Sequence, residues 1–461
     1  MNIVSELLYP AYLKSRCVTT DSRAIVEGCI FFAFKGATFD GNAFAPEALR
    51  RGAALCVVED PQYCCDSRCI LVPDVLGTLQ DLARYHREQL GIPVIGITGT
   101  NGKTTTKELV RSVLAKRYRT HATSGNFNNH LGVPLTLLSM PADTEVLIVE
   151  MGANHPGEID MLCGIAQPDY GLITNVGKAH LEGFGSFEGV VHTKTELYRF
   201  VASRCGTVFV DADNDILMEQ ASRLATIAEV PSMVPGYIPG LPAVMGACNA
   251  KKQFSLVSYG AAEDADVKGS LVGSDPFMRF CIEDGDEVYS IATQLLGNYN
   301  FGNAMAAAAV GSFFGVDCFD IKTAIEEYEP ANKRSQYKSG PHNNLILDCY
   351  NANPSSMKVA IDNFAAMKCD HKVVMLGGMK ELGSESAREH EALVQRIEEC
   401  GFERVVLVGR EFSVKSNERL LWFEDVEKAK HHFEECPLSG ATILLKGSNS
   451  TRMWLLEEVL L

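Results

Sequence analysis

The residues best suited to chemistry lie in a Gly-rich turn, Gly99 to Thr105, which follows the apolar run Val94 to Thr98. In such a turn, backbone N–H groups and the start of the next helix face phosphate oxygens. Lys103 would contact the outer phosphates and the Thr104 hydroxyl would bind Mg²⁺. Ile97 stands where the full pattern has its first Gly, so this is a shortened G-x-x-G-K-T loop, and an ordinary βα turn with a surface Lys is the weaker alternative. The predicted nucleotide-binding residues are Gly99, Thr100, Asn101, Gly102, Lys103, Thr104 and Thr105.

Three further side chains could join a metal or phosphate site. Glu150 ends an apolar stretch, His180 follows another, and Lys194 lies in a helical segment. Ligands of a doubly wound sheet bind at the carboxyl ends of its strands, so a carboxylate there can bind a metal ion. From the residues alone, a solvent-facing Glu150, a structural His180 and a solvated Lys194 remain open as alternatives.

The elements that must position these side chains alternate between strand and helix. Apolar strands are predicted near residues 93–98, 145–150, 170–174 and 207–210, with helices between them, as in a parallel α/β sheet. Residues 1–88 contain shorter β-rich runs, and about 212–286 is turn-rich and alternating, which indicates an antiparallel insertion. After a break at 328–330, strands and helices alternate again, which predicts a second doubly wound unit.

Length and composition agree with this division. The chain has 461 residues, enough for about three domains of ordinary size. We therefore expect domains at residues 1–88, 89–328 and 329–461. The net charge of -16 argues against a protein that coats nucleic acid or an anionic membrane.

The same composition indicates a cytoplasmic protein. Fifteen cysteines are scattered without a disulfide or zinc-site pattern, which fits a reducing compartment. Residues 1–13 carry Glu6 and no basic stretch, so they do not resemble a signal peptide. No apolar run reaches the roughly 18 residues of a membrane span, so we expect no membrane partner. The net charge of -16 leads us to expect no nucleic-acid partner.

Several motifs together give a resemblance to a known family. They are Thr98–Thr106, Gly125–Pro134, Leu296–Ala304, Asp348–Met357, Met379–Gly383 and Leu445–Ser448. This set resembles the Mur ligase family, and within it the branch that joins D-alanyl-D-alanine to UDP-N-acetylmuramoyl-tripeptide. The N-A-N-P run at 351–354 differs from the D-N-P-R of the branch that adds the third amino acid. Residues 20–23 and 34–36 resemble the UDP-sugar domain of the same branch.

The resemblance implies an α/β fold of three domains: a UDP-sugar domain, a central P-loop ATPase domain with a parallel sheet, and a C-terminal Rossmann-like domain that binds the dipeptide and closes. It implies an ATP-dependent ligase, working through an acyl phosphate in peptidoglycan precursor synthesis, on which cell shape and division depend. The enzyme would be a cytoplasmic monomer that uses two Mg²⁺ ions. Whether the third residue of the tripeptide is diaminopimelate or lysine stays open.

The resemblance also assigns roles to residues. Lys103, Glu150, His180 and Lys194 would be catalytic, and Thr104, Glu150, His180 and a carbamylated Lys194 would bind the metal ions. The nucleotide would also contact Asn300, Asn303, Arg334 and Asp348. The other two substrates would contact Ser22, Lys35, Asn126, Asn128, Asn129, Tyr350, Asn351 and Asn353.

Three positions depart from that branch. Gly378 stands where Asp is usual, Asn449 where Arg is common, and Asn42 where His is usual. The first two concern the dipeptide contacts or the closure interface rather than the ATP site.

Rival classes fit less well. A GTPase would need D-x-x-G shortly after the loop and an N-K-x-D base reader. The D-x-x-G near the loop, Asp74 to Gly77, precedes it, and Asn332-Lys333 is followed by Arg-Ser. A non-catalytic nucleotide-binding protein remains the alternative from another class, together with a third-residue-adding ligase. We would expect such a non-catalytic protein to have lost Lys103, Glu150, His180 or Lys194, and all four are present.

Overall fold

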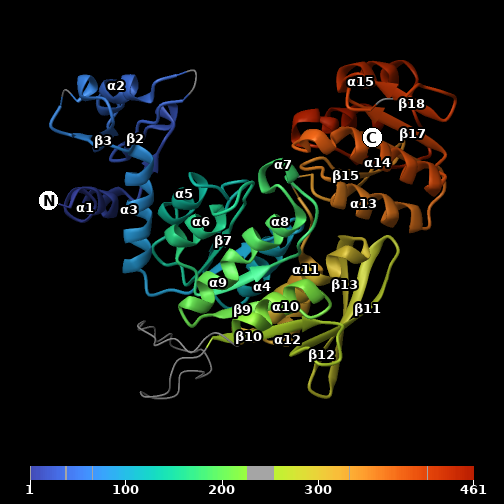
Figure 1. Ribbon diagram of the computed structural model, residues 1–461, viewed down its shortest axis with the longest axis horizontal. Helices are drawn as coiled ribbons and strands as arrows, with labels where there is room; N and C mark the ends of the chain where they lie inside the picture. Colours follow the sequence, from blue (N-terminus) through green and yellow to red (C-terminus); the bar gives the residue numbers. More distant parts are fainter. Residues whose placement is uncertain (1, 37–38, 65, 226–253, 332, 413) are drawn as a thin grey trace.

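The computed structural model describes residues 2–36, 39–64, 66–225, 254–331, 333–412 and 414–461 (Figure 1). Its strands form three separate sheets of four, nine and six strands. In Figure 1 the first sheet lies at one end of the molecule and the last sheet at the other, with the large central sheet between them. The α/β fold class predicted from the sequence is confirmed.

The first sheet is small and parallel, in the order β1-β2-β3-β4. Its strands are β1 (Val18–Thr19), β2 (Ile30–Phe32), β3 (Leu55–Val58) and β4 (Cys69–Leu71). The helical elements of this part are η1 (Val4–Leu8), α1 (Tyr9–Ser15), η2 (Ser22–Ala24), η3 (Gly41–Phe44), α2 (Ala45–Arg50) and η4 (Pro61–Tyr63). All three residues of β2 are buried, because helices cover both faces of a parallel sheet.

Helix α3 (Val75–Gln89) connects the first sheet to the central part. Asp74 caps it by accepting a hydrogen bond from the Gly77 amide at 2.9 Å. Its buried face belongs to the same apolar core as residues of η1 and of the central helices α5 (Gly132–Leu138) and α6 (Glu158–Ala166). This helix therefore packs on both parts of the chain.

The central sheet contains a parallel section in the order β10-β9-β8-β5-β7-β6. These strands are β5 (Val94–Thr98), β6 (Thr120–Ala122), β7 (Val146–Glu150), β8 (Tyr170–Ile173), β9 (Thr207–Asp211) and β10 (Ser255–Gly260). β5 lies between β7 and β8 and is buried along its whole length. The Gly-rich turn thus leaves the middle of the sheet.

Helices surround this sheet. They are α4 (Lys103–Leu114), α5 (Gly132–Leu138), α6 (Glu158–Ala166), α7 (Leu181–Phe184), α8 (Phe187–Lys194), α9 (Glu196–Ser203), α10 (Asp215–Ala225), η5 (Asn298–Asn300), α11 (Phe301–Phe313) and α12 (Cys318–Glu327). The Ala-rich helix α11 is almost wholly buried, and a Cβ added at Gly311 would lie 2.4 Å from Val113 on α4. Small side chains therefore let α11 and α4 approach closely.

Three antiparallel strands extend the central sheet at one edge. β11 (Val267–Ser274), β12 (Phe277–Asp284) and β13 (Glu287–Leu296) form a meander, and β11 joins the parallel section through β10. The predicted antiparallel insertion over about 212–286 is confirmed for these strands. It is wrong for residues 215–225, which form helix α10, and for β10, which pairs parallel with β9. Residues 226–253 of the predicted range lie outside the described residues.

The C-terminal sheet has the order β14-β15-β19-β16-β17-β18. Its strands are β14 (Gln336–Ser339), β15 (Asn344–Asp348), β16 (Lys372–Gly377), β17 (Arg404–Val408), β18 (Leu420–Phe423) and β19 (Thr442–Lys446). Only the edge strand β14 runs antiparallel. The helical elements are α13 (Pro354–Ala366), η6 (Gly383–Glu385), α14 (Ser386–Cys400), α15 (Val426–Glu435), η7 (Asn449–Thr451), η8 (Met453–Leu456) and α16 (Glu457–Leu460). The predicted second doubly wound unit is confirmed.

Among the helices in the described part of the chain, none is long and apolar enough to cross a membrane.

Candidate active site

A large cavity lies between the central and C-terminal sheets. Its volume is about 840 Å³, within the usual range for ligand sites. Strand ends and loops of both sheets line it. The predicted residues that it brings together are Gly99, Thr100, Asn101, Gly102, Lys103, Thr105, Asn126, Asn128, Asn129, Glu150, His180, Lys194, Asn300, Asn303, Arg334, Asp348, Tyr350 and Asn351.

The Gly-rich loop has a backbone that only glycine fits at two positions. Gly99 has φ 143° and Gly102 has φ 78°. A Cβ at Gly99 would lie 2.0 Å from the Thr174 hydroxyl, and one at Gly102 would lie 2.5 Å from Asn303 Oδ1. Asn175, at the end of β8, accepts a hydrogen bond from the Asn101 amide at 3.0 Å. The loop is therefore fixed before any ligand binds, and α4 begins directly after it.

Lys103 folds back over this loop. Its ammonium donates to the carbonyl oxygens of Gly99 at 2.7 Å and Thr100 at 3.0 Å. Burial lowers the pKa of Lys103 to about 8, Glu150 raises it, and Arg334 lowers it further. A phosphate group beside the ammonium would favour the charged form again. The Lys103 ammonium is therefore positioned to bind an anionic ligand.

Glu150 is an acidic group of the cavity that hydrogen bonds hold in place. It ends β7 and is 1% exposed. Thr104 donates its hydroxyl to one carboxylate oxygen at 2.9 Å, and Asn128 donates its amide to the other at 2.9 Å. The Glu150 amide is itself bound to the Thr123 hydroxyl at 3.0 Å. Hydrogen bonds thus orient both oxygens of this carboxylate.

Lys194 is buried at the end of α8. Its amine donates to the Ala153 carbonyl at 3.4 Å and lies 5.5 Å from the centre of the Phe184 ring. Burial, and then the charge of Lys103, lower the pKa of Lys194 to about 7. A substantial fraction of this amine is therefore uncharged near neutral pH and can react as a nucleophile.

His180 lies in the loop between β8 and α7, lines the cavity and contacts the C-terminal part. Its Nδ1 forms a hydrogen bond with the carboxylate of Glu381, which precedes η6. Burial lowers the pKa of His180, and Glu381 opposes this effect.

The C-terminal side of the cavity carries a charged and aromatic group. The Arg334 guanidinium lies 3.7 Å from the centre of the Tyr350 ring. Asp348 forms an ion pair with Lys446, whose ammonium also donates to the Asn351 carbonyl at 3.3 Å. The C-terminal side thus contributes the Arg334 guanidinium and the Asp348 carboxylate, paired with Lys446, to the cavity that the Gly-rich loop also lines.

One predicted residue connects the two sides directly. Asn353 caps α13 by accepting from the Ser356 amide at 2.8 Å, and its own amide donates to Asn101 Oδ1 at 2.9 Å. The start of a C-terminal helix is thereby bound to the Gly-rich loop.

Three further Asn side chains of the cavity have structural partners. Asn303 accepts from the Thr106 hydroxyl at 3.0 Å and donates to Asn300, whose amide is bound to the Leu296 carbonyl. Asn129 accepts from the Gly132 amide at 2.8 Å at the start of α5. These residues shape the wall of the cavity as well as lining it.

Two predicted residues lie elsewhere. Ser22 begins η2, and Lys35 pairs with Asp40 at 4.0 Å, both beside the first sheet and outside the cavity. Asn42, the departure in this region, is buried and accepts from the Glu59 amide at 2.9 Å. It therefore holds two loops of the first sheet together.

The two C-terminal departures lie side by side. The Ser448 hydroxyl donates to the Gly378 carbonyl at 3.4 Å, and Asn449 follows on the cavity wall. A Cβ at Gly378 would lie 2.6 Å from a Glu411 carboxylate oxygen, and Glu411 is paired with Lys380. A carboxylate from a different strand end thus occupies the space beside Gly378.

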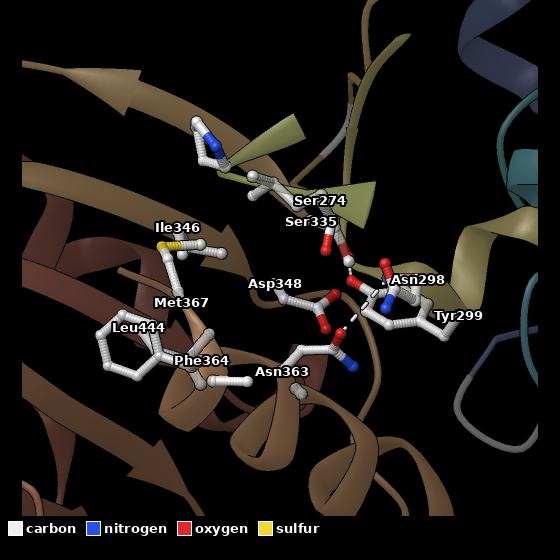
Figure 2. A pocket seen from close by; sticks show the side chains of 15 residues that line it. Ser274, Asn298, Tyr299, Ser335, Ile346, Asp348, Asn363, Phe364, Met367 and Leu444 are labelled. Atoms are coloured by element: carbon white, nitrogen blue, oxygen red, sulfur yellow. Dashed lines mark hydrogen bonds between the residues drawn. The ribbon is translucent and has the colours of Figure 1, made fainter. Parts of the chain in front are cut away.

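A second, smaller cavity of about 70 Å³ adjoins the large one. Tyr299, Ser335, Asp348 and Ala360 line both. Figure 2 shows Asp348 and Asn363 pointing toward Tyr299, whose hydroxyl is bonded to Ser335 at 2.8 Å. This is a second zone in which side chains of the central and C-terminal parts meet.

Sequence reasoning did not select Asn175, Glu381 or Lys446. Each lies at or just after the end of a predicted strand, which is the signal that could have found them. Glu381 lies in the motif Met379–Gly383 and Lys446 in the motif Leu445–Ser448. Their partners, His180 and Asp348, are far away in the sequence.

The donor set of this cavity suits Mg²⁺ bound together with phosphate. Within the described ranges, no three or more His, Cys, Asp or Glu side chains gather as a metal site. Mg²⁺ in nucleotide enzymes usually takes one or two carboxylates and completes its shell with phosphate oxygens and water. Thr104 and Glu150, which lie 2.9 Å apart through Oγ1 and Oε2, could hold one ion in that way.

Comparison with known proteins assigns the family. Family models match residues 14–94 (Mur ligase family, catalytic domain), 97–229 (Mur ligase middle domain) and 333–449 (Mur ligase, glutamate ligase domain). A UDP-N-acetylmuramoyl-tripeptide--D-alanyl-D-alanine ligase of Bacillus subtilis is 32% identical over 96% of this chain and 92% of its own length. The chain belongs to the Mur ligase family.

Other Mur ligases agree over nearly the full length. The ligase of the same description from Escherichia coli is 31% identical over 99% of this chain and 96% of its own. Among solved Mur ligase structures, MurF from Acinetobacter baumannii has a TM-score of 0.81 at 30% identity, covering 96% of this chain and 92% of that one. MurF from Thermotoga maritima in complex with ADP has a TM-score of 0.80 at 26% identity, covering 97% of both chains.

Proposed function

We propose that this Mur ligase joins D-alanyl-D-alanine to UDP-N-acetylmuramoyl-tripeptide with hydrolysis of ATP to ADP and phosphate. The observation that carries the proposal is the arrangement of Lys103, Glu150 and Lys194 around one cavity, which Arg334 and Asp348 complete from the C-terminal side. The names of the B. subtilis and E. coli relatives support the choice of substrates.

The chemistry follows from the need to activate a carboxylate. An oxygen of the tripeptide carboxylate attacks the γ-phosphorus of ATP, the bond to the β-phosphate oxygen breaks, and ADP leaves. The free amine of the dipeptide then attacks the carbonyl carbon of the acyl phosphate. The C–N bond forms, phosphate leaves with the C–O electrons, and the amine loses a proton. Lys103 offsets the negative charge that gathers on the transferred phosphoryl group.

Two Mg²⁺ ions belong to the proposal, and when bound they offset the repulsion between carboxylate and phosphates. Thr104 and Glu150 would hold one ion, and His180 and Lys194 would hold the other. We include carbamylation of Lys194, in which its neutral amine adds CO₂ and releases a proton. The resulting carbamate supplies an anionic oxygen, which suits Mg²⁺ where an ammonium would repel it. The lowered pKa of Lys194, about 7, supports this step because it leaves amine free to react.

The proposal divides the work among three domains, residues 1–88, 89–328 and 329–461. The first, with Ser22 and Lys35, would hold the UDP-sugar end, the second ATP, and the third the dipeptide. We expect a cytoplasmic location, because the reaction uses ATP and the fifteen cysteines follow no disulfide pattern. The expectation of a monomer comes from the family resemblance alone.

The test is phosphate release by the purified full chain with ATP, Mg²⁺, UDP-linked tripeptide and D-alanyl-D-alanine. We expect release only when all are present, together with a product whose mass equals the two substrates less one water. Tripeptides ending in diaminopimelate and in lysine are compared side by side to choose between them. Phosphate release that ignores the dipeptide, or none with either tripeptide, would contradict the proposal.

A further inference from the structure

The contact between His180 and Glu381 joins two parts of the chain that are far apart in sequence. His180 lies in the loop between β8 and α7 of the central part, and Glu381 lies in the loop between β16 and η6 of the C-terminal part. A Glu381 carboxylate oxygen is bound to His180 Nδ1. Both residues line the large cavity.

Both partners have an unusual backbone. His180 has φ 49° and Glu381 has φ 61°, in the left-handed region that residues other than glycine seldom adopt. Such conformations persist where surrounding structure fixes them, and they cluster at functional sites. Gly383 follows with φ 52°, and a Cβ there would lie 3.4 Å from Glu182 on α7. The backbone conformations of the β8–α7 and β16–η6 loops therefore fit the contact between them.

The contact determines which ring nitrogen of His180 can accept a cation. A carboxylate accepts hydrogen bonds only, so it places the ring proton on Nδ1. The lone pair of the neutral ring then lies on Nε2. Histidines that bind metals commonly have this arrangement, with a carboxylate holding the other nitrogen. Glu381 itself is 57% exposed at its side chain, so packing does not explain its position.

Two other contacts of the same interface involve Lys178, which is not a residue proposed to bind metal. Lys178 pairs with Glu389 at 3.9 Å, and the Ser355 hydroxyl donates to the Lys178 carbonyl at 3.3 Å. They dock the C-terminal part on the central part. Glu381 is different, because its partner is His180.

We propose that Glu381 is a positioning residue, which orients His180 for the second metal ion when the C-terminal domain docks on the central domain. This inference rests on the proposed function, since that function supplies the metal ion. Under this proposal, catalysis requires docking, because Glu381, on the domain proposed to bind the dipeptide, orients the His180 ring.

The test measures metal binding directly, with Mn²⁺ as the probe. Free Mn²⁺ is followed by electron paramagnetic resonance in titrations of the full chain with a non-hydrolysable ATP analogue. The variants are Glu381→Ala and, as the matched control, Glu389→Ala, which removes a carboxylate from the same interface. We expect Glu381→Ala to weaken Mn²⁺ binding at the site that contains His180 by about 10-fold or more. Glu389→Ala should change the Mn²⁺ affinity of that site less than about twofold.

A double variant separates positioning from docking. In a His180→Ala background, adding Glu381→Ala should change Mn²⁺ affinity no further, because the residue acts through His180. Equal effects of Glu381→Ala and Glu389→Ala, or an unchanged affinity in Glu381→Ala, would overturn the inference. The titration needs neither tripeptide nor dipeptide. If the proposed ligase reaction failed, the effect of Glu381→Ala on Mn²⁺ binding could still be measured and interpreted.

Discussion

The two sides of the large cavity are built in different ways. On the central side, the functional groups are buried and fixed by hydrogen bonds: Glu150 is 1% exposed and is held by Thr104 and Asn128. On the C-terminal side, side chains reach across the interface from exposed loops, and Glu381 is 57% exposed.

We interpret this difference as a central side that is assembled before substrates bind and a C-terminal side that completes the site by docking. Preorganised groups stabilise developing charge without rearranging during the reaction. Contacts that form on closure can exclude water and commit the substrates. It is consistent with this division that two of the departures from the related branch, Gly378 and Asn449, lie on the C-terminal side and none lies in the Gly-rich loop.

Removing the cation of the central side should have the largest effect. We expect Lys103→Ala to lower kcat by about 10³-fold, because the transferred phosphoryl group loses its fixed positive charge. Phosphate release under saturating substrates measures this. A loss of less than about tenfold would mean that the central side does not dominate the chemistry.

The next effect concerns Lys194. We expect Lys194→Ala to lower activity by about 100-fold and short carboxylic acids such as acetate to restore part of it, because they supply the missing anionic oxygen. Lys103→Ala assayed with the same acids is the control and should show no rescue. Unchanged activity of Lys194→Ala would contradict the proposed carbamylation of Lys194.

A smaller effect is expected on the C-terminal side. Asn353→Asp keeps the oxygen that caps α13 but removes the amide that donates to Asn101. We expect kcat/KM to fall by about tenfold while the free energy of unfolding changes by less than about 0.5 kcal/mol. Denaturant unfolding and steady-state kinetics measure the two quantities. Ser355→Ala, which removes a longer contact at the same interface, should cost less activity than Asn353→Asp.

The smallest effect should come from Gly378→Asp, which restores the residue usual in the related branch. Here the added carboxylate would meet that of Glu411, so we expect the free energy of unfolding to fall by about 1 kcal/mol. Adding Glu411→Ala should recover most of this loss. No recovery in the double variant would contradict the view that Glu411 occupies the space of the missing Asp.

Much of the central side could be predicted from sequence because its signals are local. The strand β5, its glycines, Lys103 and the start of α4 follow one another without interruption, and Glu150 ends an unmistakable apolar strand. The structure adds what spacing cannot give: Asn128, expected near substrate, donates to Glu150.

The C-terminal side was less predictable because its contacts join distant residues. Glu381 and His180, and Asn353 and Asn101, meet only after the two sheets pack together. Lys446 and Asp348 meet across the neighbouring strands β19 and β15 of the C-terminal sheet, 98 residues apart in sequence. β1, of two residues, escaped prediction because so short a run shows no alternation. β14, as long as the predicted β8, escaped because its sequence, Gln336–Ser339, is mostly polar and none of it is fully buried.

The most direct test of the central claim follows the oxygen atoms of the tripeptide carboxylate. When both are ¹⁸O, activation through an acyl phosphate leaves one ¹⁸O in the new amide and transfers the other to phosphate. We predict that the phosphate released by the full chain with ATP and D-alanyl-D-alanine carries one ¹⁸O per turnover, read by mass spectrometry. Phosphate without ¹⁸O, released at the same rate as amide product, would contradict the account.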